Sequence, residues 1–451
     1  MRLRLFGAGV VSLVVPAVAG AAEGAALHAH PLAAVPFGVL LAAVAVLPLV
    51  AGYWWHANRH KAVVAGACAL PVAVYLLTQP GGGAALGHEL ENYASFVVLL
   101  AALYTISGGV VMRGDVRPTP GVNVGFLAAG AVLANVIGTT GASMLLIRPV
   151  LRINARRARR VHVPVFFIFV VSNTGGLLTP LGDPPLFLGF LQGVEFTWTL
   201  RLWPQWLVVN GAVLAVFYVW DKLADRHGRA AALRPAETGP GGPGDTPADP
   251  LGVDGLRVNG PLMLGVIAAV VAKKYVPFPV GELVMVALTV VSLRATPKRL
   301  RAANGFAWGP MAEVAILFAG IFVAMVPALA LLNDHGAGFG LTRPWEYFWV
   351  TGALSSVLDN APTYLTTATL AAGGQGLAEL AAARPDLLAA VSCGAVFMGA
   401  NSYIGNGPNF MVKAIAEENG YAMPSFAAYM LTAALVLLPV FAVVTVVFFR
   451  G

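Results

Sequence analysis

Long apolar runs alternate with short polar segments along most of the chain. A helix that crosses a bilayer needs about 20 predominantly apolar residues, and most of these runs are close to this length. Basic residues occupy many of the short segments, as is typical of cytoplasmic loops. We therefore expect an all-α polytopic membrane protein, with spans at about 33–55, 62–79, 92–112, 204–222, 258–272, 279–294, 309–332 and 424–449.

One apolar stretch, residues 121–150, is too long for a single untilted span and too short for two. Its centre, from Asn135 to Gly141, is polar and contains glycine, and basic residues flank both of its ends. Both ends should therefore lie on the cytoplasmic side, which predicts a re-entrant helical hairpin with its tip inside the membrane. A second hairpin, with its tip near Asp359, is expected at residues 345–370.

Two further apolar stretches, at about 163–193 and 386–418, have centres that cannot continue a helix. The first reads TPLGDPPLF from Thr179 to Phe187, and the second reads SYIGNGPNF from Ser402 to Phe410. Proline removes backbone donors, and glycine leaves the backbone free to turn. We predict two broken membrane helices, because transporters bind ions and substrates with unwound backbone of this kind near the bilayer midplane. A kinked helix without a binding role is the alternative.

The hairpin and the broken helix occur once in each half of the chain, in the same order. Residues 225–257 separate the halves and are rich in Pro, Gly and acidic residues, which predicts a flexible cytoplasmic linker. Counted from this linker, the two hairpins enter from opposite faces, so residues 33–224 and 258–450 should be inverted repeats. Residues 1–22 have a basic start, an apolar core and small residues, as a signal peptide or an N-terminal helix has.

The composition excludes several other classes of protein. Hydrophobic residues make up 58% of the 451 residues and charged residues 11%, which does not fit a water-exposed surface. The net charge of +7 comes from basic residues clustered in short loops, so we read it as setting membrane orientation and expect no nucleic-acid partner. Two cysteines in apolar runs do not make a disulfide framework. Catalytic and nucleotide-binding patterns are absent, so we expect neither an enzyme nor a cofactor.

Asp183 and Asp359 are the two acidic residues that this topology places near the midplane. A carboxylate there is protonated, paired or bound to an ion, although either residue could instead cap the half-helix that follows it. We rank Asp359 first because it lies at a hairpin tip, whereas Asp183 directly precedes Pro184, as a capping residue would. Neutral oxygens for a sodium site would come from Asn135, Thr139, Thr140, Ser172, Asn173, Thr174, Asn360, Thr363, Asn401, Ser402 and Asn406.

These segments resemble the ion transporter superfamily, which includes NhaD-type sodium/proton antiporters, arsenite permeases, and citrate and dicarboxylate carriers. The resemblance covers nearly all of residues 33–450, and the chain is most similar to the NhaD type. It is carried by FVVLLAALYTISGGVV (96–111), ANVIGTTGASMLLIRP (134–149), SNTGGLLTPLGDPPLF (172–187), VLDNAPTYLT (357–366) and SYIGNGPNF (402–410). The resemblance implies a homodimer in which a scaffold domain holds a mobile, elevator-type transport domain. We expect a multi-pass protein of the bacterial inner membrane.

The segment Ser172–Thr174 matches the SNT signature by which the dicarboxylate carriers bind sodium and a substrate carboxylate. The corresponding segment of the second half reads Ala400–Asn401–Ser402, and Asp359 adds a negative charge from which an anion carrier gains nothing. These departures favour a secondary sodium/proton antiporter, whose two carboxylates alternate between protons and sodium ions. The alternative is a cation-coupled carrier of citrate, a dicarboxylate or arsenite, in which the carboxylates hold only the coupling cation.

Overall fold

The computed structural model describes residues 27, 29–114, 116–232 and 252–451. Its regular structure is helical apart from β1 (Val111–Arg113) and β2 (Gly252–Asp254), which pair antiparallel. Seven of the described helices are long and apolar enough to cross a membrane, or up to eight if one bent helix pair is counted as a span. The expected all-α polytopic membrane protein is therefore confirmed.

The elements follow one another in nearly the expected order. The first half contains η1 (Pro31–Ala34), α1 (Val35–Val50), α2 (Gly52–Trp55), α3 (Asn58–Thr78), α4 (Gly82–Ser107), α5 (Pro120–Asn154), α6 (His162–Val170), η2 (Thr174–Leu178), α7 (Pro184–Leu191), η3 (Trp198–Leu202) and α8 (Trp203–Ala232). The second half contains α9 (Leu256–Ala272), α10 (Val280–Ala295), α11 (Lys298–Ala303), α12 (Gly309–His335), η4 (Gly336–Phe339), α13 (Pro344–Ser355), α14 (Asn360–Ala372), α15 (Leu377–Ala383), α16 (Pro385–Met398), η5 (Gly399–Asn401), α17 (Gly407–Glu418) and α18 (Phe426–Phe448).

The helix α5 turns back on itself at Gly138. A straight α-helix of its 35 residues would be about 52 Å long. Asn123 near its start and Asn154 at its end nevertheless exchange side-chain hydrogen bonds of 2.8 and 3.0 Å. Gly138 lies midway between them with a φ of 78°, in the left-handed region that glycine adopts readily. The two arms of α5, residues 120–137 and 139–154, therefore form a helical hairpin.

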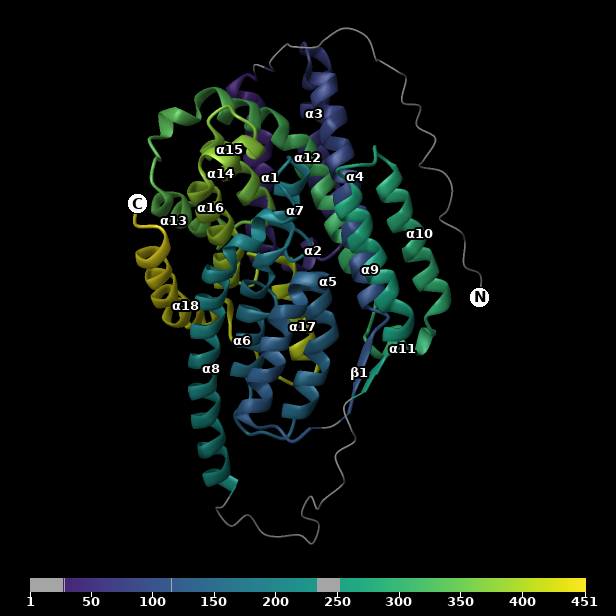
Figure 1. Ribbon diagram of the computed structural model, residues 1–451, viewed down its shortest axis with the longest axis vertical. Coiled ribbons are helices and arrows are strands. Elements are labelled where there is room, and N and C mark those ends of the chain that lie inside the picture. The colour runs from purple at the N-terminus through teal and green to yellow at the C-terminus, as the bar shows by residue number, and fades with distance from the viewer. Residues whose placement is uncertain (1–26, 28, 115, 233–251) are drawn as a thin grey trace.

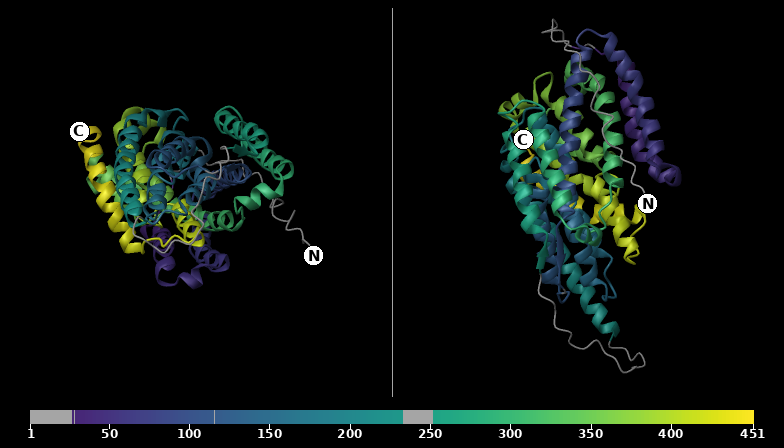
Figure 2. Two further views of the ribbon diagram at one scale, coloured as in Figure 1. Left: turned by 90° about the horizontal axis from the view of Figure 1, so that it is seen from below. Right: turned by 90° about the vertical axis from the view of Figure 1, so that its right-hand side faces the viewer.

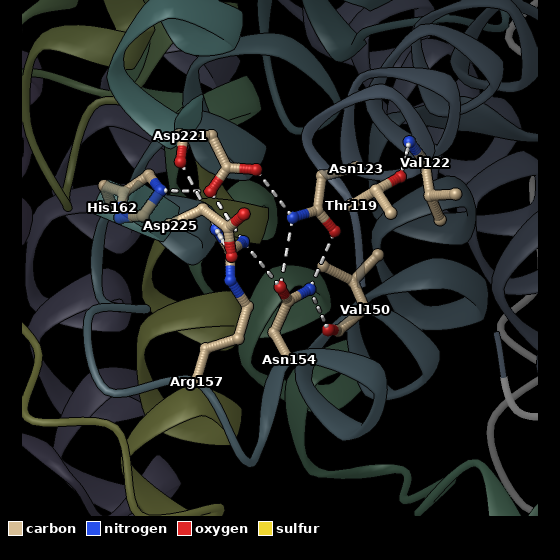
Figure 3. Close-up of polar contacts among 9 residues, drawn as sticks. All are labelled: Thr119, Val122, Asn123, Val150, Asn154, Arg157, His162, Asp221 and Asp225. Carbon is tan, nitrogen blue, oxygen red and sulfur yellow. Dashed lines mark hydrogen bonds and ion pairs between the residues drawn. The ribbon is translucent and has the colours of Figure 1, made fainter. Parts of the chain in front are cut away.

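A polar cluster joins the open end of this hairpin to α6 and α8 (Figure 3). Asp221 of α8 is fully buried, and its Oδ2 accepts a hydrogen bond from Asn123 at 2.9 Å. Its Oδ1 lies 2.6 Å from the guanidinium of Arg157 and 2.7 Å from Nε2 of His162. Arg157 also donates to Asn154 at 3.0 Å. The cluster thus fixes both arms of the hairpin, and the start of α6, to α8.

The second hairpin consists of α13 and α14, with residues 356–359 as its tip, and it packs against α16. Each broken helix has a first half, a short 3₁₀ turn, a non-helical segment of turns and bends, and a second half. These parts are α6, η2, residues 179–183 and α7 in one case, and α16, η5, residues 402–406 and α17 in the other. Both breaks therefore occur where proline and glycine interrupt the apolar runs.

The helices form two groups that lie side by side (Figure 1). α3, α4, α9, α10 and α12 pack against one another in one group. The hairpins and the broken helices pack together in the other, with α8 and α18 beside them. Viewed from below, α9 and α10 lie at one side of the molecule and α18 at the opposite side (Figure 2). This grouping is compatible with a scaffold and a transport domain, while the inverted repeats and the elevator motion stay predictions.

The linker between the halves is shorter than the predicted residues 225–257. α8 continues to Ala232, because the residues after its membrane span include alanine and arginine, which favour helix, and a helix need not end at the membrane surface. At the other end, β2 pairs with β1, where Arg113 forms an ion pair with Asp254. The middle of the linker, like the predicted signal peptide or N-terminal helix at 1–22, lies outside the described residues.

Candidate ion and substrate site

Four helical segments begin around one buried point. Asp183 is the N-cap of α7, and Asn406 is the N-cap of α17. Asn360 is the first residue of α14, and Thr139 is the first residue after the bend in α5. The N-terminus of a helix carries roughly half a positive charge. Partial positive charge from several helix ends is therefore directed at this point.

Asp183 lies at the centre of this arrangement and is fully buried. Its Oδ1 accepts hydrogen bonds from the Thr139 hydroxyl at 2.8 Å and from the Asn406 amide at 2.9 Å. Its Oδ2 accepts a hydrogen bond from the Asn360 amide. These donors come from both hairpins and from the second broken helix. The carboxylate of Asp183 thus joins elements from both halves of the chain.

Closely packed glycines allow each break to fold back on itself. A Cβ at Gly182 would lie 2.1 Å from the carbonyl oxygen of Gly176, and a Cβ at Gly405 would lie 2.6 Å from that of Gly399. Gly182 directly precedes the N-cap residue Asp183, and Gly405 directly precedes the N-cap residue Asn406. Larger side chains at these glycines would push apart the two backbone segments that meet at each break. They would also displace the N-cap residues Asp183 and Asn406.

Asp359 lies at the edge of the site and makes a capping contact. Its carboxylate accepts a hydrogen bond from the backbone N–H of Ala361 at 3.0 Å, and its carbonyl accepts one from the Thr363 hydroxyl at 2.8 Å. Asp359 is half-buried, whereas Asp183 is fully buried and makes no side-chain capping bond. The capping role considered for both residues is therefore observed at Asp359. These contacts favour Asp183 as the first candidate, whereas the sequence ranked Asp359 first, and the functional order of the two stays a prediction.

The segment Ser172–Thr174 is held from three directions. The hydroxyl of Ser172 lies 2.8 Å from that of Ser143 in the second arm of α5. The amide of Asn173 donates to Asn409 of α17 at 2.7 Å and accepts from Asn406 at 3.2 Å. Thr174 donates to Asn210 of α8 at 2.8 Å. The SNT segment thus connects α5, α8 and α17.

The remaining predicted residues lie in the same breaks and tips. Asn135 donates to the Gly175 carbonyl at 2.7 Å and accepts from the Leu178 N–H at 2.7 Å, which ties η2 to the first hairpin. Thr140 is half-buried beside Thr139. Ser402 accepts from the Gly405 N–H at 3.1 Å, and Asn401 donates to Ser356 at 2.9 Å.

Two amide oxygens near the tip of the second hairpin have no hydrogen-bond partner within the described part of the chain. They are Oδ1 of Asn360 and Oδ1 of Asn401, and both are buried. Asn360 already donates to Asp183 through its other amide atom. A buried acceptor without a donor is costly. Each is therefore a candidate ligand for a cation, and one of them belongs to Asn360, whose amide nitrogen contacts Asp183.

Sequence reasoning did not identify two asparagines that shape this site. Asn409 is fully buried, and its amide donates to the carbonyls of Gly399 and Ser402 at 2.9 Å in each case. Asn210 donates to the Thr174 carbonyl at 3.1 Å. Asn210 lies in a predominantly apolar span. A polar residue inside a membrane span is often functional, so the sequence could have identified Asn210 as a candidate. Asn409 belongs to the motif SYIGNGPNF, of which only Ser402 and Asn406 were predicted as site residues.

A buried polar centre, built from helix breaks and enclosed by apolar helices, defines a multi-pass membrane carrier. The chain belongs to the family described as "Putative citrate transport", which matches residues 26–449 and so includes every residue of the site. It is thus a secondary transporter of a family similar to the ion transporter superfamily. No curated protein matches the chain. The closer similarity to NhaD-type antiporters stays a prediction.

Proposed function

We propose that this protein is a cation-coupled carrier of citrate or a related carboxylate anion. The observation that carries the proposal is the gathering of helix N-termini around Asp183. Helix N-termini favour anionic groups, and transporters direct broken-helix N-termini at substrate carboxylates. The family description names citrate, which carries several carboxylates. Anion transport was the alternative in the sequence analysis, and these two observations now favour it over cation exchange.

In this proposal, Asp183 holds the coupling cation, which is sodium or a proton. Its carboxylate has only neutral donors around it in the described contacts, so no cationic side chain there matches its charge and a bound cation could do so. The free Oδ1 of Asn360 supplies a neutral oxygen beside it. Hard cations such as sodium prefer oxygen ligands of this kind. A bound cation would cancel the charge of Asp183 and leave the helix N-termini free to attract the anionic substrate.

The two hairpins would bring the substrate across the membrane together with the broken helices. The polar cluster at Asp221 joins the first hairpin to α6 and α8, and the second hairpin packs on α16. These elements would therefore move as one body against α3, α4, α9, α10 and α12. A homodimer formed through the latter group would give the moving part a fixed support.

Uptake by purified protein in liposomes tests the proposal. We expect radiolabelled citrate to accumulate when an inward sodium or proton gradient is applied, and to equilibrate without accumulation when both gradients are absent. Empty liposomes and liposomes with the Asp183→Asn protein are the controls. Proton movement driven by sodium alone, together with no uptake of citrate, would replace this function with sodium/proton antiport.

Antiport remains the second candidate because of one specific observation. Asp359 provides a second carboxylate next to Asn360, whose amide contacts Asp183. Two neighbouring carboxylates can exchange a sodium ion for protons without an anionic substrate. The liposome experiment separates the candidates, since antiport requires proton movement in the absence of citrate.

A further inference from the structure

A groove of about 610 Å³ lies between α8 and the loop that precedes α6. One wall is apolar and is formed by Val216, Val219, Trp220 and Leu223 of α8. These positions follow the spacing of a single helix face, and all four side chains are exposed. Arg159 and His162 also line the groove. The groove thus combines an apolar wall with a basic rim at the end of α8 that we expect on the cytoplasmic side.

The neighbouring arginines show why Arg159 differs from the rest of its loop. Arg157 is paired with buried Asp221. Arg160 donates to the Gly420 carbonyl at 3.0 Å and lies over the ring of Tyr421. Arg159 is exposed, and within the described residues it forms no hydrogen bond or ion pair. Its guanidinium is therefore available to a ligand at the rim of the groove.

The rim keeps a positive character because the nearest buried acid is already neutralised. Asp221 lies behind His162, and the charge of its carboxylate is matched by Arg157. The ring of His162 stacks on that of Trp220 with centroids 6.5 Å apart, which joins the rim to the apolar wall. An anion at the rim would therefore meet Arg159 without opposition from an unpaired carboxylate in this cluster.

We propose that this groove binds an anionic phospholipid of the cytoplasmic leaflet. The phosphate pairs with Arg159, whose planar guanidinium can hold two phosphate oxygens at once. One acyl chain lies along the apolar face of α8, where the ten residues from Ala215 to Ala224 extend for about 15 Å. Basic pockets beside membrane helices on this side are suited to anionic headgroups. The bound lipid covers the polar cluster that holds the first hairpin to α8.

Native mass spectrometry of the full-length protein tests this assignment. The protein is released from mixed vesicles of phosphatidylglycerol and phosphatidylcholine, and the lipid that stays bound is measured. We expect retention of phosphatidylglycerol, and about fivefold less of it in Arg159→Gln, as for the loss of one arginine near an anionic surface. Arg156→Gln is the matched control, because Arg156 is exposed on the same loop but does not line the groove. This control protein should retain the lipid as the wild type does.

Three results would overturn the proposal. Equal retention of phosphatidylglycerol by the wild type and Arg159→Gln would show that Arg159 does not bind it. Competition by soluble glycerol phosphate at equal concentration would assign the rim to a free phosphate compound and not to a lipid. A change from dimer to monomer in Arg159→Gln, without loss of lipid, would make the groove a contact between two copies of the chain.

Discussion

Replacement of Asp183 by asparagine is expected to lower cation-coupled citrate uptake by a factor on the order of 100, the size of a strong coupling between two ligands. The variant keeps the volume of the side chain but removes the charge that would hold the cation. It should still fold. The new Oδ1 can accept from Thr139 and Asn406, and the new amide can donate to the free Oδ1 of Asn360 once that group turns. Uptake in liposomes and thermal unfolding in detergent measure the two effects separately.

Asp359→Asn is the matched control for this prediction. An asparagine can accept the hydrogen bond from the Ala361 N–H as the aspartate does, and the two residues are similar as N-caps. We therefore expect near wild-type stability and most of the citrate uptake. If Asp359→Asn abolished uptake while Asp183→Asn left it unchanged, the coupling cation would belong at the hairpin tip.

Replacement of Asp221 by alanine is expected to have the largest effect on stability. The side chains of Arg157 and His162 are 8% and 7% exposed, so the loss of Asp221 leaves a buried charge without its partner. Breaking a buried ion pair in this way costs about 3–5 kcal/mol. The open end of the first hairpin should also separate from α8. Chemical unfolding in mild detergent, followed by tryptophan fluorescence, measures the change in the free energy of unfolding.

Asp225→Ala provides the comparison. Asp225 lies one turn further along α8, with its carboxylate 3.8 Å from the same guanidinium and more exposed than that of Asp221. A partly exposed pair at this distance contributes less than about 1 kcal/mol. A loss of stability in Asp225→Ala equal to that in Asp221→Ala would mean that Asp221 is not the residue that holds the cluster together.

Most of the membrane spans and both helix breaks could be predicted from the sequence because their signals are local. The exceptions are α9 and α10, which are not among the helices long and apolar enough to cross a membrane. Apolar runs of bilayer length mark the spans, and the proline and glycine motifs beginning at Thr179 and Ser402 mark the breaks. The hairpin in α5 was also predictable, since basic residues at both ends of 121–150 and a glycine in the middle require the chain to return. Each of these inferences needs only residues that are neighbours in the chain.

The general capping rule did not predict which carboxylate makes a capping bond, yet the sequence contains the reason. A capping side chain bonds the backbone N–H of the second or third helical residue. In α7 the second residue is Pro185, which has no N–H, and the N–H of the third, Leu186, donates to the Asp183 carbonyl. The carboxylate of Asp183 therefore accepts hydrogen bonds from residues that are distant in the sequence. In α14, which follows Asp359, the second residue is Ala361, which does offer an N–H.

The contacts that define the centre of the site depend on tertiary structure. Thr139, Asn360 and Asn406 come from three elements far apart in sequence, and only the packing of the two halves brings them to Asp183. The same holds for Asp221, which in the sequence is one of several charged residues at the end of a span. Its pairing with Arg157 requires the hairpin to return to the start of α6.

The central claim is that Asp183 holds a cation whose binding promotes the binding of a carboxylate anion. The most direct measurement is the affinity of the purified protein for citrate as sodium concentration and pH are varied, by isothermal titration calorimetry. Because coupling between two ligands is reciprocal, we predict that citrate binds more tightly as sodium rises or pH falls, and that Asp183→Asn removes this dependence. Citrate binding that is unchanged by either cation, or that depends on sodium equally in wild type and Asp183→Asn, would contradict it.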